Sequence, residues 1–208
     1  MSIIRKPFRY EYRSVTVLIA VLCVVMWRLT ELVPNLYRLL ALTPILTIRA
    51  RMYWQVFTYQ FLHGGFWHLF SNMIGLLIFG TAVEKKTGSR EFLLFYLLVA
   101  TLCGIAACAG YTMFGLQRVT LIGASGAVFA VLYLFAVLFP HSTVFVFGFI
   151  PLPSPLLVII YGCMEVYDML FAHDTVAHSI HLLGLFFAWL YIRIRFGIKP
   201  MKVWNFIR

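Results

Sequence analysis

The stretch Leu121-Ile-Gly-Ala-Ser-Gly-Ala-Val-Phe-Ala130 places a serine among small residues, inside a run apolar enough to lie in lipid. Ser125 comes seven residues after Arg118, the last charge before the run, which corresponds to about 10 Å along a helix. The flanking Gly123 and Gly126 would let another helix backbone approach closely. Taken alone, the stretch favours a packing role for the serine, because small residues are common where transmembrane helices touch.

The composition indicates a membrane protein. The chain has 208 residues, of which 62% are hydrophobic and only 12% charged. The net charge of +10 comes from cations at the ends of apolar runs. This placement fits contact with membrane lipid, and we expect no nucleic-acid partner. The four cysteines lie in apolar segments without metal-ligand spacing, so they are interpreted as small buried hydrophobic residues.

Hydropathy predicts an all-α polytopic membrane protein with six transmembrane helices in a single domain, residues 1–208. Of its lysines and arginines, 12 fall on one side of the predicted membrane and 5 on the other, which predicts that both termini lie in the cytoplasm. The segment Leu32–Phe61 is apolar but interrupted by prolines and arginines, so we expect a loop half-sunk in the outer leaflet. The predicted spans run at about 14–33, 64–83, 91–114, 121–139, 153–171 and 175–193.

The second, fourth and sixth spans run in the same direction, and each carries polar side chains in its first half. Polar residues in lipid tend to face the bundle interior and pair there, so these side chains are expected to meet at similar depth. They are His63, His68 and Asn72 on the second span, Ser125 on the fourth, and His178 and His181 on the sixth.

These residue types suit peptide hydrolysis, which needs a nucleophile, a base and donors for the developing oxyanion. Ser125 is the best-placed serine, and either His181 or His178 could take its proton. His68 and Asn72 are four residues apart and share a helix face, from which both could donate hydrogen bonds. The backbone N–H of Ser125, early in its helix, could be a third donor.

We expect a Ser–His dyad, because neither aspartate is placed to orient the base. Asp174 lies two helical turns before His181, and Asp168 is on another helix. Glu165 and Asp168 share one face near the outer end of the fifth span, where a position at the water interface is favoured over a functional one. His178 and His181 have a spacing that could hold a metal, but no cysteine or carboxylate clearly completes the set. We therefore predict neither a metal nor another cofactor.

At this point the sequence resembles the rhomboid intramembrane serine proteases, in their basic six-helix bacterial form. Gly123-Ala-Ser-Gly126 is similar to the family's G-x-S-G, and His68-Leu-Phe-Ser-Asn72 to its H-x-x-x-N. His181-Leu-Leu-Gly184 is similar to the catalytic H-x-x-G. The stretch from Trp54 to His63 is like the one that ends the family's first loop.

The resemblance implies a rhomboid-like bundle with a membrane-embedded first loop, in a bacterial inner (cytoplasmic) membrane. It implies Ser125 as nucleophile, His181 as base, and His68 with Asn72 as oxyanion donors. Substrates would be single-pass transmembrane proteins, entering past the second and fifth spans and cut near their extracytoplasmic end. Small residues such as Gly184 would support helix packing.

Three positions depart from the family pattern. Gln55 stands where an arginine is common, which bears on loop docking. Ala188 replaces a glycine but keeps small-residue packing with Gly184. Phe129 replaces a tyrosine one turn after the serine; it could stack beneath His181 or simply face lipid.

Two other functions are alternatives to the protease. An inactive relative that only binds membrane clients would usually lack the serine or the histidine, and both are present. A small proton-coupled transporter using Glu165, Asp168 and the histidines should show internal repeats or broken paired helices, and the sequence shows neither.

Overall fold

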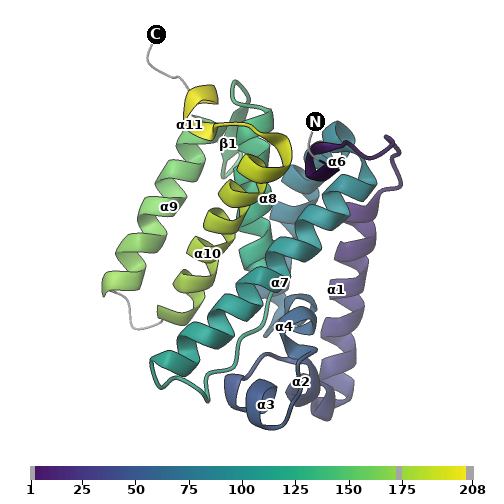
Figure 1. The fold of residues 1–208 in the computed structure, drawn as a ribbon, viewed down its shortest axis with the longest axis vertical. Helices are drawn as coiled ribbons and strands as arrows, with labels where there is room; N and C mark the ends of the chain where they lie inside the picture. Colours follow the sequence, from purple (N-terminus) through teal and green to yellow (C-terminus); the bar gives the residue numbers. More distant parts are fainter. Residues whose placement is uncertain (1–2, 172–174, 205–208) are drawn as a thin grey trace.

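The chain forms a helical bundle around one short central helix. The computed structural model describes residues 3–171 and 175–204. The central helix is α8 (Ser125–Leu138), which contacts α5, η3, α6, α7, α9 and α10 (Figure 1). The surrounding helices are α1 (Val15–Leu32), the continuous run α5 (Phe66–Gly75), η3 (Leu76–Gly80) and α6 (Thr81–Thr87), then α7 (Ser89–Met113), α9 (Ser154–Phe171), and α10 (Thr175–Tyr191) with η4 (Ile192–Phe196).

Five of these helical runs are long and apolar enough to cross a membrane. The helix α8 has 14 residues, about 21 Å of rise, which is less than the ~30 Å of a bilayer's hydrocarbon core. We predicted a sixth full-length span at 121–139, but the helix found there is too short to cross the hydrocarbon core alone. Because α8 is enclosed by other helices, it does not need to span lipid on its own.

Residues 121–124, expected to be helical, are not part of a helix. Leu121 pairs with Leu42 as an antiparallel bridge, and Gly123 has φ +114°, a conformation that side chains disfavour. The helix therefore begins at Ser125, and the depth inferred by counting helical residues from Arg118 does not hold. The position of His181 relative to Asp174 cannot be compared in the same way, because Asp174 lies outside the described residues.

The first loop folds into short helical pieces and docks on the bundle. Two of them begin with proline at the first helical position, where the missing N–H has no cost. The side chain of Gln55 is fully buried: its Oε1 accepts from Thr47 Oγ1 at 2.9 Å, and its Nε2 donates to the Arg38 carbonyl at 3.1 Å. Gln55 therefore ties the loop together where the family often has arginine. The pieces are α2 (Pro34–Leu40), α3 (Pro44–Arg49), α4 (Gln55–Thr58) and η2 (Tyr59–Phe61).

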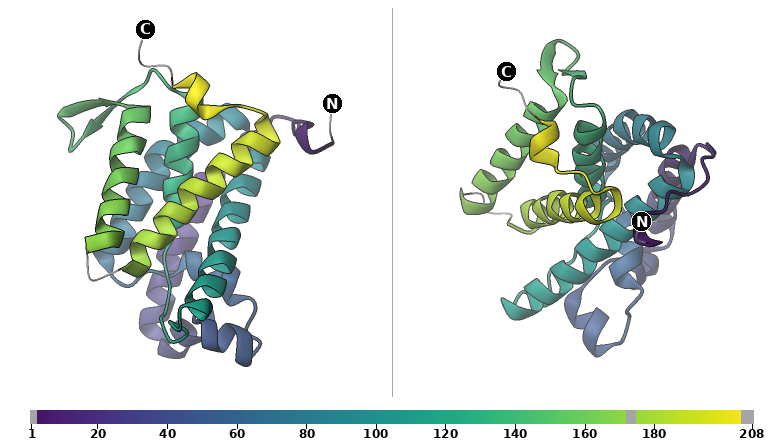
Figure 2. Two further views of the ribbon diagram at one scale, coloured as in Figure 1. Left: turned by 60° about the vertical axis from the view of Figure 1, so that its left-hand side comes forward. Right: turned by 45° about the horizontal axis from the view of Figure 1, so that its top comes forward.

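A β-hairpin, which the sequence did not lead us to expect, connects α8 to α9. Strands β1 (Thr143–Val146) and β2 (Ile150–Pro153) pair antiparallel, and Phe147 and Phe149 at the turn are largely exposed. The hairpin projects sideways from the bundle (Figure 2).

Both described ends of the chain lie at the hairpin end of the bundle, opposite α2 and α3 (Figures 1 and 2). Near the start, η1 (Ile3–Arg5) contacts η4, where Arg5 Nε donates to the Ile194 carbonyl at 3.2 Å. The short α11 (Pro200–Val203) follows η4 at the same end. This shared position fits the predicted even number of membrane crossings, which stays a prediction together with the sidedness.

Candidate active site

The segment before Ser125 is held by the first loop. Backbone bonds join Leu42 and Leu121 in both directions, at 2.8 and 3.0 Å, and the Gly123 N–H donates to the Tyr59 carbonyl at 3.0 Å. Ser125 is then the first residue of α8, so its N–H has no carbonyl earlier in the same helix to bond. The result is a serine hydroxyl and a backbone donor fixed together at a helix start, where partial positive charge favours an anion.

The helices α8 and α10 touch through glycine. A Cβ added to Gly184 would lie 2.1 Å from the Gly126 carbonyl oxygen, and one added to Gly126 would lie 3.1 Å from the Ile180 carbonyl oxygen. Ala188, one turn further along α10, is fully buried. The predicted close packing of the small residue Gly184 against the helix that carries Ser125 is therefore present.

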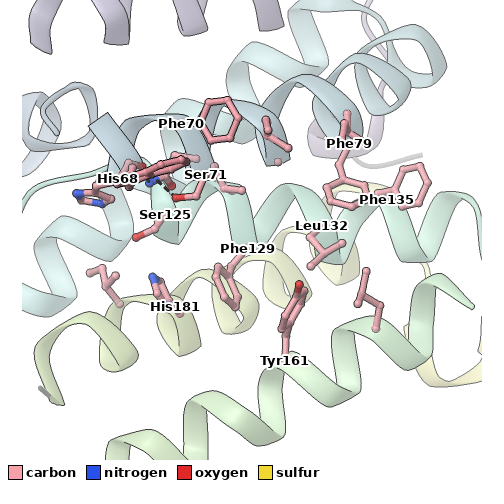
Figure 3. Close-up of a pocket in the computed structure, with 18 of the residues that line it drawn as sticks. His68, Phe70, Ser71, Phe79, Ser125, Phe129, Leu132, Phe135, Tyr161 and His181 are labelled. Carbon is pink, nitrogen blue, oxygen red and sulfur yellow. Dashed lines mark hydrogen bonds between the residues drawn. The ribbon is translucent and has the colours of Figure 1, made fainter. Parts of the chain in front are cut away.

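The ring of His181 is held flat against Phe129. The two ring centroids are 4.2 Å apart and the planes differ by 5°. Of the two positions considered for Phe129, the structure has the one beneath His181. Figure 3 shows Ser125 between His68 and His181, with a His181 ring nitrogen directed toward the serine hydroxyl.

His68 lies over the backbone just before the serine. A Cβ at Gly123 would be 2.7 Å from His68 Nε2, so both this contact and the positive φ require glycine there. The Gly64 N–H points to His68 Nδ1 at a long 3.4 Å, which assigns the proton of a neutral ring to Nε2. That N–H is available to an oxygen near Ser125.

Asn72 is buried one turn after His68. Its Nδ2 donates to the His68 carbonyl at 2.7 Å, which occupies one of its two N–H groups. Asn72, His68 and Ser125 all line the same groove. The second amide N–H is the one that an oxyanion could use.

His63, 3% exposed, supports His68 from behind, with the two rings 5.1 Å apart at a steep angle. Burial, followed by the neighbouring His68, lowers the pKa of His63 to about 4. His63 is therefore neutral at physiological pH and contributes packing rather than charge.

An apolar groove of about 1420 Å³ leads away from these residues. Its wall includes Trp67 and Phe70 of α5 on one side and Leu157 and Tyr161 of α9 on another. At the far end it is lined by Thr143–Phe147, from the β-hairpin. The groove thus runs between the second and fifth predicted spans along much of the bundle.

The expectation that no acid approaches His181 is wrong. Glu165 of α9 is 9% exposed; its Oε1 lies 2.9 Å from His181 Nδ1, and its Oε2 lies 2.6 Å from His178 Nδ1. The sequence offered no carboxylate to complete a metal site with His178 and His181. The structure places Glu165 there, since one potential ligand atom from each of the three residues lies within 4.8 Å of the others.

The preference for an interfacial Glu165 fails because α9 turns this residue inward, while Asp168, one turn on, is half-buried. The sequence did contain a signal for this position, because Glu165 is an ionisable residue within an apolar helix and such residues are often functional. Asp174 lies outside the described residues.

Comparisons with known proteins agree with this fold. Residues 50–198 match the Rhomboid domain. Over 98 residues the chain is 38% identical to Rhomboid protein 1, mitochondrial, of Saccharomyces cerevisiae, covering 45% of this chain and 27% of that protein. Over 154 residues it is 32% identical to RHOMBOID-like protein 12, mitochondrial, of Arabidopsis thaliana, covering 67% and 46%.

A third similarity is to the rhomboid protein YdcA of Bacillus subtilis, 35% identical over 94 residues, or 44% of this chain and 45% of that protein. The chain therefore aligns with less than half the length of each of these relatives. The domain match, in contrast, extends over most of the chain, from the first loop to the end of the last long helix. With five helices apolar enough to cross a bilayer, the chain is an integral membrane protein and belongs to the rhomboid family.

Proposed function

We propose that the chain is an intramembrane serine endopeptidase that cleaves membrane-anchored proteins near the extracytoplasmic end of their transmembrane segment. One observation carries the proposal: Ser125 and His181 face each other at one end of an apolar groove into which His68 and Asn72 also open. Membership of the rhomboid family supports the proposal, and one similar protein, YdcA of Bacillus subtilis, is named as a rhomboid protease.

The chemistry follows from the positions of four side chains. His181 takes the proton of Ser125 as Oγ attacks the scissile carbonyl carbon. His68 Nε2–H, the free N–H of Asn72 and the backbone N–H of Ser125 are donors for the oxygen of the tetrahedral intermediate. His181 then gives its proton to the leaving amine. In the second half of the reaction His181 takes a proton from water, which attacks the acyl-enzyme, and returns that proton to Ser125 as the acid product leaves.

The groove supports a transmembrane segment as the substrate. It is apolar, opens between α5 and α9, and reaches from Ser125 to the hairpin at the opposite end of the bundle. A helix in lipid has its backbone bonds satisfied internally, so the scissile peptide must unwind next to the serine. The site's donors could receive the freed carbonyl.

We further propose that both termini lie in the cytoplasm of a bacterial inner membrane. The 12-to-5 division of the basic residues supports the orientation, as does the shared position of the described chain ends. The site then lies near the extracytoplasmic surface. A cytoplasm-active reporter fused to the C-terminus should be active; a silent reporter on an expressed protein contradicts this orientation.

A serine-reactive fluorophosphonate tests the proposal directly. The purified wild type should be labelled and should cleave a single-pass substrate in liposomes, whereas folded Ser125→Ala should do neither. His181→Ala should also be inactive, and the Ser125→Ala/His181→Ala double variant should be no worse than either alone. Cleavage by folded Ser125→Ala at the wild-type rate would overturn the assignment.

A further inference from the structure

Glu165 is a buried carboxylate whose two oxygens each face one histidine. Side-chain exposure is 11% for Glu165, 16% for His181 and 20% for His178, so water competes weakly for these contacts. We propose that Glu165 is a positioning residue that holds His181 with its proton on Nδ1 and leaves Nε2 for Ser125. This inference rests on the protease function proposed above.

The tautomer follows from what each group can donate. An ionised carboxylate only accepts hydrogen bonds, and a neutral imidazole has one N–H. Oε1 lies 2.9 Å from His181 Nδ1 without the alignment of a hydrogen bond, and this nearby negative charge favours the proton on Nδ1, which leaves the lone pair on Nε2. Since Nδ1 lies against Glu165, Nε2 is the nitrogen that remains for Ser125. Figure 3 shows a ring nitrogen of His181 directed toward the serine hydroxyl.

Orientation is fixed in two further ways. Phe129 stacks on the ring face at 4.2 Å, which sets the plane of the imidazole. Glu165 then sets the rotation within that plane, because only one ring edge meets its Oε1. When His181 takes up the serine proton, the carboxylate also stabilises the positive charge that forms. Glu165 therefore acts through His181 and does not itself contact the reacting atoms.

His178 completes the arrangement from the other side. Its Nδ1 lies 2.6 Å from Glu165 Oε2, so the second carboxylate oxygen is occupied and the group cannot turn away from His181. A glutamine at 165 has one acceptor and one donor end, so it could keep only one of the two histidines in its Nδ1–H form. The chemistry therefore distinguishes glutamate from its isosteric amide.

The same three side chains could be considered as ligands for a divalent cation. Around a tetrahedral zinc with bonds of about 2.0–2.2 Å, ligand atoms lie roughly 3.3–3.6 Å apart. The observed distances of 2.6 and 2.9 Å are shorter than this; the first is a hydrogen bond and the second is within ion-pair distance. A metal is therefore the alternative that the experiment must be able to detect.

The experiment compares Glu165→Gln, Glu165→Asp and Glu165→Ala with a control, Asp168→Asn, on the same helix one turn away. Cleavage kinetics are measured in liposomes, and each variant is first shown to be monodisperse and folded. We expect Glu165→Gln to lower kcat roughly 10²-fold with KM nearly unchanged, below the ~10⁴-fold loss of a triad with the wrong tautomer. Glu165→Asp should recover part of the rate, and Asp168→Asn should keep it.

The second readout does not depend on activity. ¹⁵N NMR of histidine-labelled protein, with the His181 signal assigned from His181→Ala, should show the Nδ1–H tautomer in the wild type and in Ser125→Ala. Glu165→Gln should shift His181 toward Nε2–H. A wild-type His181 protonated on Nε2, an undiminished kcat in Glu165→Gln, or stoichiometric zinc lost with that substitution would overturn the proposal. Failure of the protease function appears separately, as absent fluorophosphonate labelling, and leaves the tautomer result readable.

Discussion

Buried carboxylates occur at both ends of the bundle, and their neighbours differ. At the end that holds the chain termini, Glu84 is fully buried and accepts from the Val15 and Thr16 N–H groups at 2.7 and 2.9 Å, which caps α1. Glu91, 5% exposed, pairs with Arg195 at 2.7 Å. At the other end Glu165 faces two histidines.

The difference lies in the donors rather than in the carboxylates. Backbone N–H groups and a guanidinium keep their protons near neutral pH, so Glu84 and Glu91 can only hold helices together. A histidine ring nitrogen can accept a proton and give it up again during a reaction, and His181, one of the two histidines beside Glu165, also lines the groove with a serine. Burial of an acid thus indicates structure or chemistry depending on whether its partner can titrate. Four substitutions test this contrast, from the largest expected effect to the smallest.

Gly184→Ala should have the largest combined effect, on stability and on rate together, because it acts on the close contact between α8 and α10. The new Cβ would lie 2.1 Å from the Gly126 carbonyl oxygen, and backbone atoms must move to relieve it. Overpacking costs about 1–3 kcal/mol or more, and a displacement of about 1 Å at a reactive pair can cost ~10² in rate. Both cleavage rate and melting temperature should fall.

Gly162→Ala is the matched control, since its Cβ would meet Leu185 at an ordinary 3.5 Å. It should retain activity and stability. If Gly184→Ala were as active as Gly162→Ala, the contact between α8 and α10 would not set the distance between Ser125 and His181.

Glu91→Gln should lower stability while leaving turnover intact. Removing one partner of a buried ion pair costs about 3–5 kcal/mol, less here because the Arg195 side chain keeps 12% exposure. The measurement is denaturation in detergent together with kcat at a temperature where both proteins are folded. Glu11→Gln, which loses a more exposed pair with Arg13, should change little. A selective fall in kcat for folded Glu91→Gln would erase the distinction between the two ends.

Several parts of this arrangement were predictable from the sequence. Continuous apolar runs predicted the long helices, and the spacing of His68 and Asn72 predicted their common face. The small residues around Gly184 predicted a close contact, which the structure confirms.

Other parts depend on contacts that one chain's pattern does not encode. The rotation of α9 that turns Glu165 toward His181 is set by packing between helices. The non-helical form of residues 121–124 is likewise set by a distant segment, since Leu121 pairs with Leu42 of the first loop. The hairpin at Thr143–Pro153 contains two prolines, a residue type that is disfavoured within a sheet because it cannot donate a ladder hydrogen bond. Tertiary pairing outweighed local preference in each case.

Asn72→Ala should lower kcat by as much as ~10²–10³, the effect of removing one oxyanion donor, with a smaller change in KM. The physical reason is the second N–H of Asn72, since the first donates to the His68 carbonyl. Ser71→Ala is the control, because Ser71 lines the same groove and its hydroxyl donates to the same carbonyl at 3.2 Å. Equal kinetics for the two variants would reduce Asn72 to a packing residue.

The smallest effect is expected from Phe129→Leu. Phe129 stacks on His181, and such ring pairs contribute about 0.5–1.5 kcal/mol beyond the buried area. If this energy holds the ring in its reactive orientation, its loss corresponds to roughly a 2- to 10-fold change in kcat. Phe129→Tyr keeps the ring and should keep the rate. At the opposite end, Phe95 packs edge-on against Tyr191 at 5.0 Å, so Phe95→Leu should lower the melting temperature while kcat per folded molecule is unchanged. If Phe129→Leu instead lowered only stability, the ring beneath His181 would be ordinary core packing, and the contrast between the two ends would rest on the histidines and Glu165 alone.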